Sequence, residues 1–195
     1  MFGPYKNTTE DPKKYQEVYL PKVEAYRKKL ADAVLDEYKL ADDLIPTSTG
    51  FDVTKIPDGS MTKEELEIIN LTGCKLAEKI ASGEYTSVTV FKAYAKRATM
   101  AHQLTNCAME LFTDEGLKRA EELDEYLKAN GKTVGFLHGL PVSLKEHYDF
   151  KGRVTHAGYA AYIDRVSEDW CLTSKCLYDQ GAVFYIRTTQ PQCLM

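Results

Sequence analysis

Residues 137–145 read Leu-His-Gly-Leu-Pro-Val-Ser-Leu-Lys, a short β-prone run that ends in a single lysine. Alternation of side chains along a strand places Ser143 and Lys145 on one face and Val142 and Leu144 on the other. An ammonium group is expensive to remove from water unless it is paired or neutralised. A lysine drawn into such a site could act as a base or nucleophile. The chemistry of these residues alone favours a simpler interpretation, in which Lys145 reaches solvent at the strand end.

Three segments of the chain carry a further signal. They are GFLHGLPVSLKEHYDFKGRVTHAGYAAYID (135–164), the preceding segment 83–127 and the final segment 179–195. Together they resemble the amidase signature family, and most closely its fungal acetamidase-like, general amidase branch. The resemblance runs from about Leu44 to Met195. It is specific because the segments match in order at the expected separations.

The resemblance implies a catalytic role for Lys145. In the family, the lysine at this position belongs to a Ser–cis-Ser–Lys triad and relays the nucleophile's proton as a neutral amine. Desolvation and neighbouring hydrogen-bond donors are the physical means of keeping such an amine neutral near pH 7. The two serines lie in a Gly/Ser-rich loop several tens of residues after the lysine, and this sequence reaches Met195 without it. We therefore expect the first part of an amidase, with Lys145 as the one triad member present.

The implied function is the hydrolysis of small, acetamide-like carboxylic amides to an acid and ammonia. An activated serine would form an acyl-enzyme, and backbone amides would stabilise the oxyanion. The main alternative is a catalytically inert fragment that at most binds a partner. A Schiff-base lysine enzyme is a third interpretation of Lys145, although no apparatus for a carbonyl substrate is visible in the sequence.

The neighbours of Lys145 have less specific patterns. Ser143 could hydrogen-bond to the amine, but a serine satisfied by the sheet backbone is the more common case. His138 and His147 are interpreted as structural, because the family mechanism uses no histidine. Glu146 stands where the family more often has aspartate, a replacement that conserves the charge.

The end of the last predicted strand departs from the family pattern. The family usually has a Lys-Thr-Asn-like stretch there, whereas this chain has Arg187 and Thr189 at the first and third positions. These departures leave Lys145 unaffected. They put the local support for the serine loop in doubt.

Composition limits the partners. With 195 residues, of which 44% are hydrophobic and 28% charged, the chain can form a domain with a core. A net charge of −4 gives no reason to expect nucleic acid or an anionic membrane as partner. No apolar run approaches the ~20 residues that span a bilayer, and the N-terminus lacks a signal-peptide layout. We expect a cytoplasmic protein that acts on a small-molecule amide, with the oligomeric state left open.

The cysteines indicate neither a disulfide framework nor a zinc site. They number five, without a Cys-x-x-Cys pair, and four histidines are spread through the chain. Their positions are 74, 107, 171, 176 and 193. Free, buried thiols in a reducing compartment are predicted, and no cofactor or metal is expected.

The predicted fold class is α/β: an amidase-signature-like mixed sheet with flanking helices, here an incomplete N-terminal part preceded by an amphipathic helix. Residues 1–61 would form an arm, this helix and a connector, and residues 62–195 the amidase part. Pro21 must kink the helix or start it afresh. Its apolar stripe, which is expected to pack on the core, recurs every three or four residues: Tyr19, Val23, Tyr26, Leu30, Val34 and Tyr38.

Local signals predict the elements of the second region. Thr62 opens a capping box, Gly83 closes the next helix, Thr86 or Ser87 caps a third, and Asp114 caps a fourth. One helix is expected to start at residue 63, a second to span 73–83, and a third to run from the cap at Thr86 or Ser87 to about residue 102. Two more are expected at 115–130 and 168–178. Strands are expected at 107–112, 140–145 and 182–186. The last two strands with a helix between them predict a parallel pair with a crossover helix.

Overall fold

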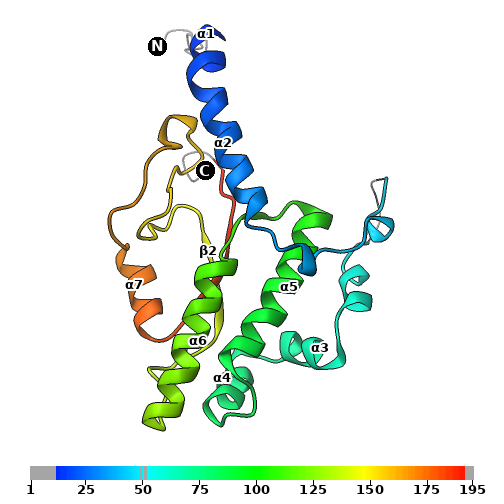
Figure 1. The fold of residues 1–195 in the computed structure, drawn as a ribbon, viewed down its shortest axis with the longest axis vertical. Coiled ribbons are helices and arrows are strands. Elements are labelled where there is room, and N and C mark those ends of the chain that lie inside the picture. Colours follow the sequence, from blue (N-terminus) through cyan, green and yellow to red (C-terminus); the bar gives the residue numbers. More distant parts are fainter. Residues whose placement is uncertain (1–11, 49, 51, 192–195) are drawn as a thin grey trace, which may run out of the picture.

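A mixed sheet of three strands lies at the centre of the part of the chain that the computed structural model describes, residues 12–48, 50 and 52–191 (Figure 1). The strands are β1 (Ala108–Leu111), β2 (Pro141–Lys145) and β3 (Val183–Thr188). β3 is central, antiparallel to β1 and parallel to β2. Helix α7 (Leu172–Asp179) lies between β2 and β3 in the chain, so the predicted parallel pair with a crossover helix is confirmed.

Residues 183–186 of β3 are apolar on both faces, as is typical of a strand in the middle of a sheet. Its pairing with β2 shifts after Val142: Phe184 is the partner of Val142, and Ile186 is the partner of Ser143. Tyr185 is therefore an extra residue in β3. A bulge of this kind changes the direction of the side chains that follow it, and Arg187 is among them.

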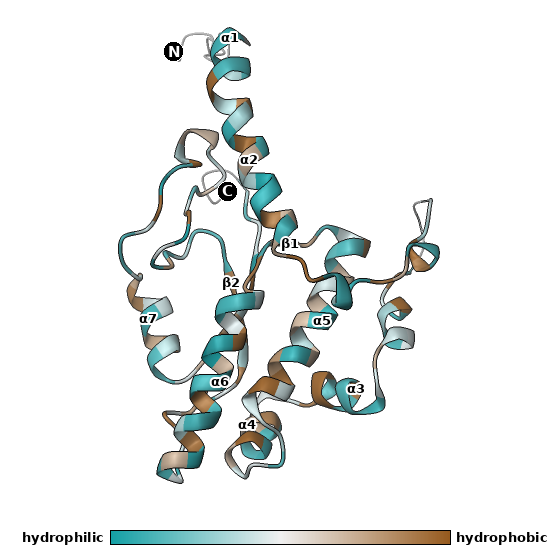
Figure 2. Cartoon of the chain, in the orientation of Figure 1, coloured by the Kyte–Doolittle hydropathy of each residue, from teal (hydrophilic) through white to brown (hydrophobic). Residues whose placement is uncertain are grey.

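Helices α5 (Ser87–Thr105) and α6 (Thr113–Asn130) pack on each other and on β3. In Figure 2, α6 carries both hydrophilic and hydrophobic bands, as expected of a helix with one side in solvent. Gly116 allows close approach of α6, since a Cβ atom there would lie 2.3 Å from the Phe91 ring and 2.8 Å from the backbone oxygen of Phe184. The buried side chains of this layer are Tyr38, Phe91, Ala95, Ala120, Leu123 and Val183.

A second cluster, rich in aromatic residues, joins the sheet to α7 and to the segment that precedes it. Leu144 of β2 belongs to it. The rings of Phe112 and Phe150 stack with centroids 4.9 Å apart, and those of Phe150 and Trp170 lie 4.2 Å apart. These contacts fix the segment that follows Lys145 against the core.

Most of the predicted helix ends are confirmed. Thr62 and Glu65 form the capping box of α3 (Lys63–Asn70), and Thr86 caps α5. Helix α4 (Gly73–Ala81) is followed by Gly83 with a positive φ of 78°. Two predictions were wrong. Asp114 lies inside the first turn of α6, which begins at Thr113 without a side-chain cap, and α7 begins at Leu172 rather than at residue 168.

The N-terminal helix is interrupted as Pro21 predicts. Residues Pro12–Lys14 (α1) lead into a π-helical turn, Tyr15–Tyr19, and α2 (Leu20–Asp32) starts afresh around the proline. Since proline has no N–H, it cannot continue the preceding hydrogen-bond ladder. Figure 1 shows α2 extending away from the sheet.

The predicted apolar stripe is only partly in the core. Tyr38 is buried, but it lies beyond the helix in a 3₁₀ turn, Asp36–Tyr38. No residue of α2 is buried, and the stripe residues Val23, Tyr26 and Leu30 are half-buried against neighbouring segments. The prediction that the whole stripe packs on the core was therefore wrong for α2. Further 3₁₀ turns span Asp42–Leu44, Ile56–Ser60 and Ala160–Tyr162.

The cysteines are free but not buried. Cys74, Cys107 and Cys176 are exposed and Cys171 is half-buried, while Cys193 lies outside the described residues. The prediction of buried thiols was wrong for these four residues, of which Cys107 lies between α5 and β1 and Cys171 directly before α7. Among the helices of the described ranges, none is both long and apolar enough to cross a membrane.

Candidate functional site

Lys145 is the last residue of β2, and its partner in the sheet is Thr188 of β3. Its side chain is exposed, as is that of Ser143, whereas Leu144 is buried. The predicted alternation at the strand end is therefore confirmed. Within the described part of the chain, neither Lys145 nor Ser143 has a hydrogen bond or ion pair through its side chain.

A hollow of about 310 Å³ opens beside the lysine. The ring of His147 packs beside that of Tyr148, with centroids 4.5 Å apart, and its Nδ1 is buried without a partner in the described residues. The residues that line the hollow come from β2, the turn after it, α7 and β3: Ser143, Leu144, Lys145, His147, Tyr148, Thr173, Leu177 and Thr188. Among the described residues, no side chain pairs with the amine at the edge of this hollow.

Glu146, the next residue, is directed into the protein and is 1% exposed. Its two carboxylate oxygens accept hydrogen bonds from the backbone N–H groups of His156, at 2.6 Å, and Ala157, at 2.9 Å. Ala157 has a φ of 51°, a left-handed conformation that is uncommon for a residue with a Cβ atom. The carboxylate therefore holds a strained turn against the end of β2.

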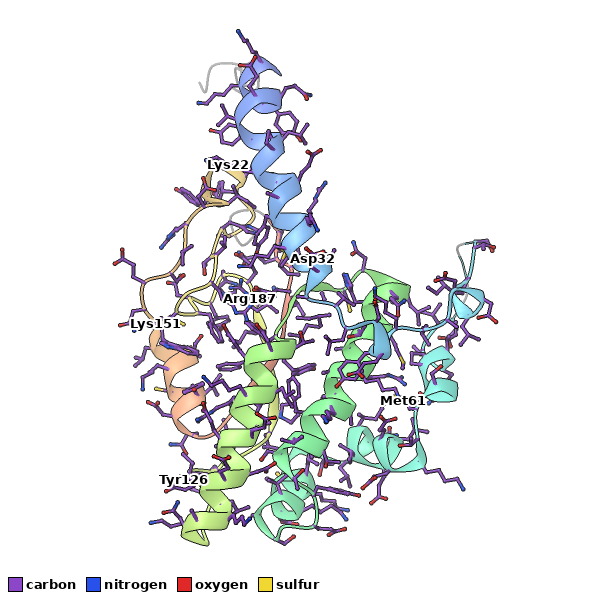
Figure 3. All side chains as sticks on the ribbon, viewed as in Figure 1. Lys22, Asp32, Met61, Tyr126, Lys151 and Arg187 are labelled. Atoms are coloured by element: carbon purple, nitrogen blue, oxygen red, sulfur yellow. The ribbon has the colours of Figure 1, made fainter. Side chains whose placement is uncertain are left out.

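Arg187 of β3 is completely buried and lies in the dense packing of side chains at the middle of the molecule (Figure 3). Its Nε and Nη2 donate to Oε2 of Glu110, at 2.9 and 2.6 Å. Nη2 also donates to the carbonyl oxygen of Val154, at 2.7 Å, and Nη1 to that of Glu146, at 3.4 Å. Oε1 of Glu110 accepts from Arg153 at 2.5 Å. A network of buried charges thus contacts the backbone of Glu146, the residue directly after Lys145.

Helix α2 covers part of this network. The ring of Tyr26 meets that of His156 edge-on, with centroids 5.9 Å apart. Burial, together with the negative charge of Glu110, raises the pKa of Tyr26 to about 12. Burial also lowers the pKa of His156 below its ordinary value, although the nearby Glu146 carboxylate opposes the shift. Tyr26 and His156 therefore shield the network mainly as neutral groups near pH 7.

His138 has the structural role expected of it. It is 2% exposed, and its Nδ1 accepts a hydrogen bond from the backbone N–H of Val134 at 3.1 Å. Burial is the main cause that lowers its pKa. The imidazole fixes the loop before β2 and lines no part of the hollow at Lys145.

The sequence interpretation missed the Glu110–Arg187 pair. The signal was present, because each residue is a single charge inside a short, otherwise apolar or uncharged strand. Charged residues are rarely fully buried unless they are paired, so two such strands indicate a cross-strand ion pair. The resemblance to the family identifies Arg187 only as a departure from the usual pattern.

Residues 89–195, more than half of the chain, match the family profile described as Amidase. The chain therefore belongs to the amidase family, and the resemblance inferred from the sequence is confirmed. It is 41% identical to an acetamidase of Emericella nidulans over 169 residues, which are 87% of this chain and 30% of that protein. An amidase of Gibberella zeae is 41% identical over 170 residues, or 86% of this chain and 31% of the relative.

Solved structures support the same family. A fatty acid amide hydrolase matches with a TM-score of 0.88 and 49% identity over 95% of this chain and 33% of its own. A peptide amidase from Stenotrophomonas maltophilia matches with a TM-score of 0.57 and 27% identity over 63% of this chain and 25% of its own. The mixed α/β fold class is confirmed. The chain spans about a third of the length of the proteins it matches.

Proposed function

We propose that this chain supplies the general base of an enzyme that hydrolyses small carboxylic amides to an acid and ammonia. The observation that carries the proposal is Lys145, whose amine lies at the end of β2 beside an open hollow and has no partner in the described residues. It occupies the position where the sequence resembles the lysine of the amidase signature triad. Membership of the amidase family and the similarity to an acetamidase support amides as substrates.

The proposed mechanism passes one proton through Lys145. A serine hydroxyl attacks the amide carbonyl, and its proton moves through a second serine to the neutral Nζ of Lys145. The ammonium then returns the proton to the departing nitrogen, which leaves as ammonia. Water hydrolyses the acyl-enzyme by the reverse relay and releases the acid. In this proposal, the serines and the oxyanion donors come from a loop that is not among residues 1–195.

The surroundings of Lys145 leave its side chain open to a further group. In the described residues, the side chain has no carboxylate partner that an approaching group would have to displace. The nearest acidic residue along the chain, Glu146, is turned inward and satisfied by two backbone amides. The lysine is thus left available to a hydroxyl group that approaches from the hollow.

The proposal is tested in a fused enzyme, in which this chain replaces the matching 30% of the acetamidase of Emericella nidulans. Ammonia release is measured with acetamide and with longer aliphatic amides, and aniline release is measured with acetanilide. We expect turnover of at least the small aliphatic amides, with acid and ammonia formed in equal amounts. A folded fused enzyme without turnover on any of these amides would favour the inert-fragment alternative.

A further inference from the structure

We propose that Arg187 is a positioning residue for Lys145: held by Glu110, its guanidinium fixes the backbone at the end of β2. The inference rests on the proposed function, in which Lys145 is the base. It assigns a role to the arginine that departs from the family's usual Lys-Thr-Asn-like stretch.

The contacts of Arg187 join three segments of the chain. One guanidinium bonds to Glu110 of β1, to the carbonyl oxygen of Val154 and to that of Glu146, the residue directly after Lys145. A guanidinium has five donors in a fixed planar fork, so it can hold these acceptors at defined angles. A lysine ammonium at the same place is a point charge on a flexible stem and could not span the same set.

The position of Lys145 depends on its backbone, because its side chain has no polar partner in the described ranges. The backbone beside it is held from several directions. The N–H of Glu146 donates to the carbonyl oxygen of Thr188 at 3.0 Å. The carboxylate of Glu146 binds the amides of His156 and Ala157, and the carbonyl of Glu146 accepts from Arg187.

Stability alone is a poor reason for a buried ion pair at this place. Removing two charges from water is costly, and well-packed apolar residues of similar volume often give equal or greater stability. Arg187 is 0% exposed and Glu110 is 5% exposed, so both groups bear this cost. A defined geometry at the strand end is what the pair provides and an apolar pair would not.

The test uses kinetics of the fused enzyme. Arg187→Met should lower kcat about 10- to 100-fold per folded molecule, because a misplaced catalytic group loses rate at this scale. KM should be unchanged, since Arg187 does not line the hollow. Arg187→Lys, which restores the charge but not the fork, should recover part of the lost kcat.

Arg153→Met is the matched control. Arg153 also pairs with Glu110 and is 11% exposed at its side chain, but its hydrogen bonds go to carboxylates and not to the backbone beside Lys145. It should lower stability while leaving kcat unchanged. If Arg187→Met and Arg153→Met lower the melting temperature alike and both keep the parent kcat, Arg187 is structural only and the inference is overturned.

Two further arrangements keep the test decisive. If Arg187→Met does not fold, the double variant Glu110→Gln, Arg187→Met removes both buried charges and is judged by the same kcat. In the 195-residue chain itself, faster amide hydrogen exchange at Glu146, His156 and Ala157 in the variant supports the inference, and unchanged exchange opposes it. Failure of the proposed function is distinguishable, because the parent fused enzyme would then show no turnover at all.

Discussion

Arg187 and Glu110 are direct partners across β3 and β1, and their side chains meet inside the protein with Nη2 2.6 Å from Oε2. The backbone pairing and the ion pair thus join the same two residues. The bulge at Tyr185 and the register shift in β1 between Ala108 and Glu110 accompany this arrangement. The guanidinium of this pair also donates to the backbone carbonyl of Glu146, next to Lys145 at the end of β2.

Breaking the pair from one side should strongly destabilise the fold. Glu110→Ala leaves Arg187 buried without a carboxylate, which typically lowers the free energy of unfolding by about 3–5 kcal/mol. Glu115→Ala is the control, because Glu115 contacts Arg153 from a side chain that is 50% exposed and such pairs contribute only about 0–1 kcal/mol. Urea unfolding of both variants measures the difference. Equal losses would contradict the buried pair as described.

Glu146 should matter for the fold more than its place beside an exposed lysine suggests. Glu146→Ala leaves two part-buried backbone N–H groups without their acceptors, and a fully buried unsatisfied donor would cost about 1–3 kcal/mol. Glu146→Asp should lose less but not be neutral, since the shorter side chain cannot reach both amides in the same geometry. The exposed Glu168 provides the control, as Glu168→Ala, in a thermal unfolding series. If Glu146→Ala leaves the melting temperature unchanged, the Glu146 carboxylate does not stabilise the turn at Ala157.

The approach of α6 to β3 depends on the absence of a side chain at Gly116. Gly116→Ala should destabilise the chain by about 1–3 kcal/mol, as expected of overpacking, because backbone as well as the Phe91 ring must move. Gly59→Ala is the matched control for Gly116→Ala, since a Cβ atom at residue 59 would meet nothing within 4 Å. Comparable melting temperatures for the two variants would show that α6 packs less closely.

Stability should fall as the pH is lowered below about 6.5. Burial is the main cause that lowers the pKa values of His102, His138 and His156 in the folded chain. These residues therefore bind fewer protons folded than unfolded, so the free energy of unfolding decreases as the pH falls from the ordinary histidine pKa towards their folded values. Melting temperatures between about pH 5 and 8 measure this dependence. His138→Asn, which keeps an acceptor for Val134, should have a shallower slope, and an unchanged slope would oppose the assignment.

Much of the fold follows from local patterns in the sequence. The capping box at Thr62, the cap at Thr86 and the strand at 182–186 were predictable because each depends on neighbours along the chain. The start of α7 at Leu172 was not, because the residues before it are held by long-range bonds, such as those from the Ser167 hydroxyl to Asp149 and Thr155. Tertiary contacts there outweigh helix propensity.

Part of the candidate site could likewise be predicted from the sequence, and part could not. Lys145 and the exposed face it shares with Ser143 could be predicted from strand alternation and the family resemblance. The support behind it could not, because Glu110 and Arg187 are far apart in the sequence and meet only through the antiparallel pairing of β1 with β3. The inward turn of Glu146 towards Ala157 likewise depends on a left-handed residue that carries a Cβ atom, and the neighbouring Gly158 (φ 79°) does not by itself identify it.

The most direct measurement of the central claim is the turnover of acetamide by the fused enzyme with Lys145→Met. The side chain is exposed and unpaired in the described residues, so its replacement should leave the melting temperature unchanged. Lys151→Met, at another exposed lysine (Figure 3), is the control. We predict that Lys145→Met lowers kcat/KM by several powers of ten while Lys151→Met keeps the parent value. Retention of more than about a tenth of the parent kcat/KM by a folded Lys145→Met enzyme would contradict Lys145 as the base.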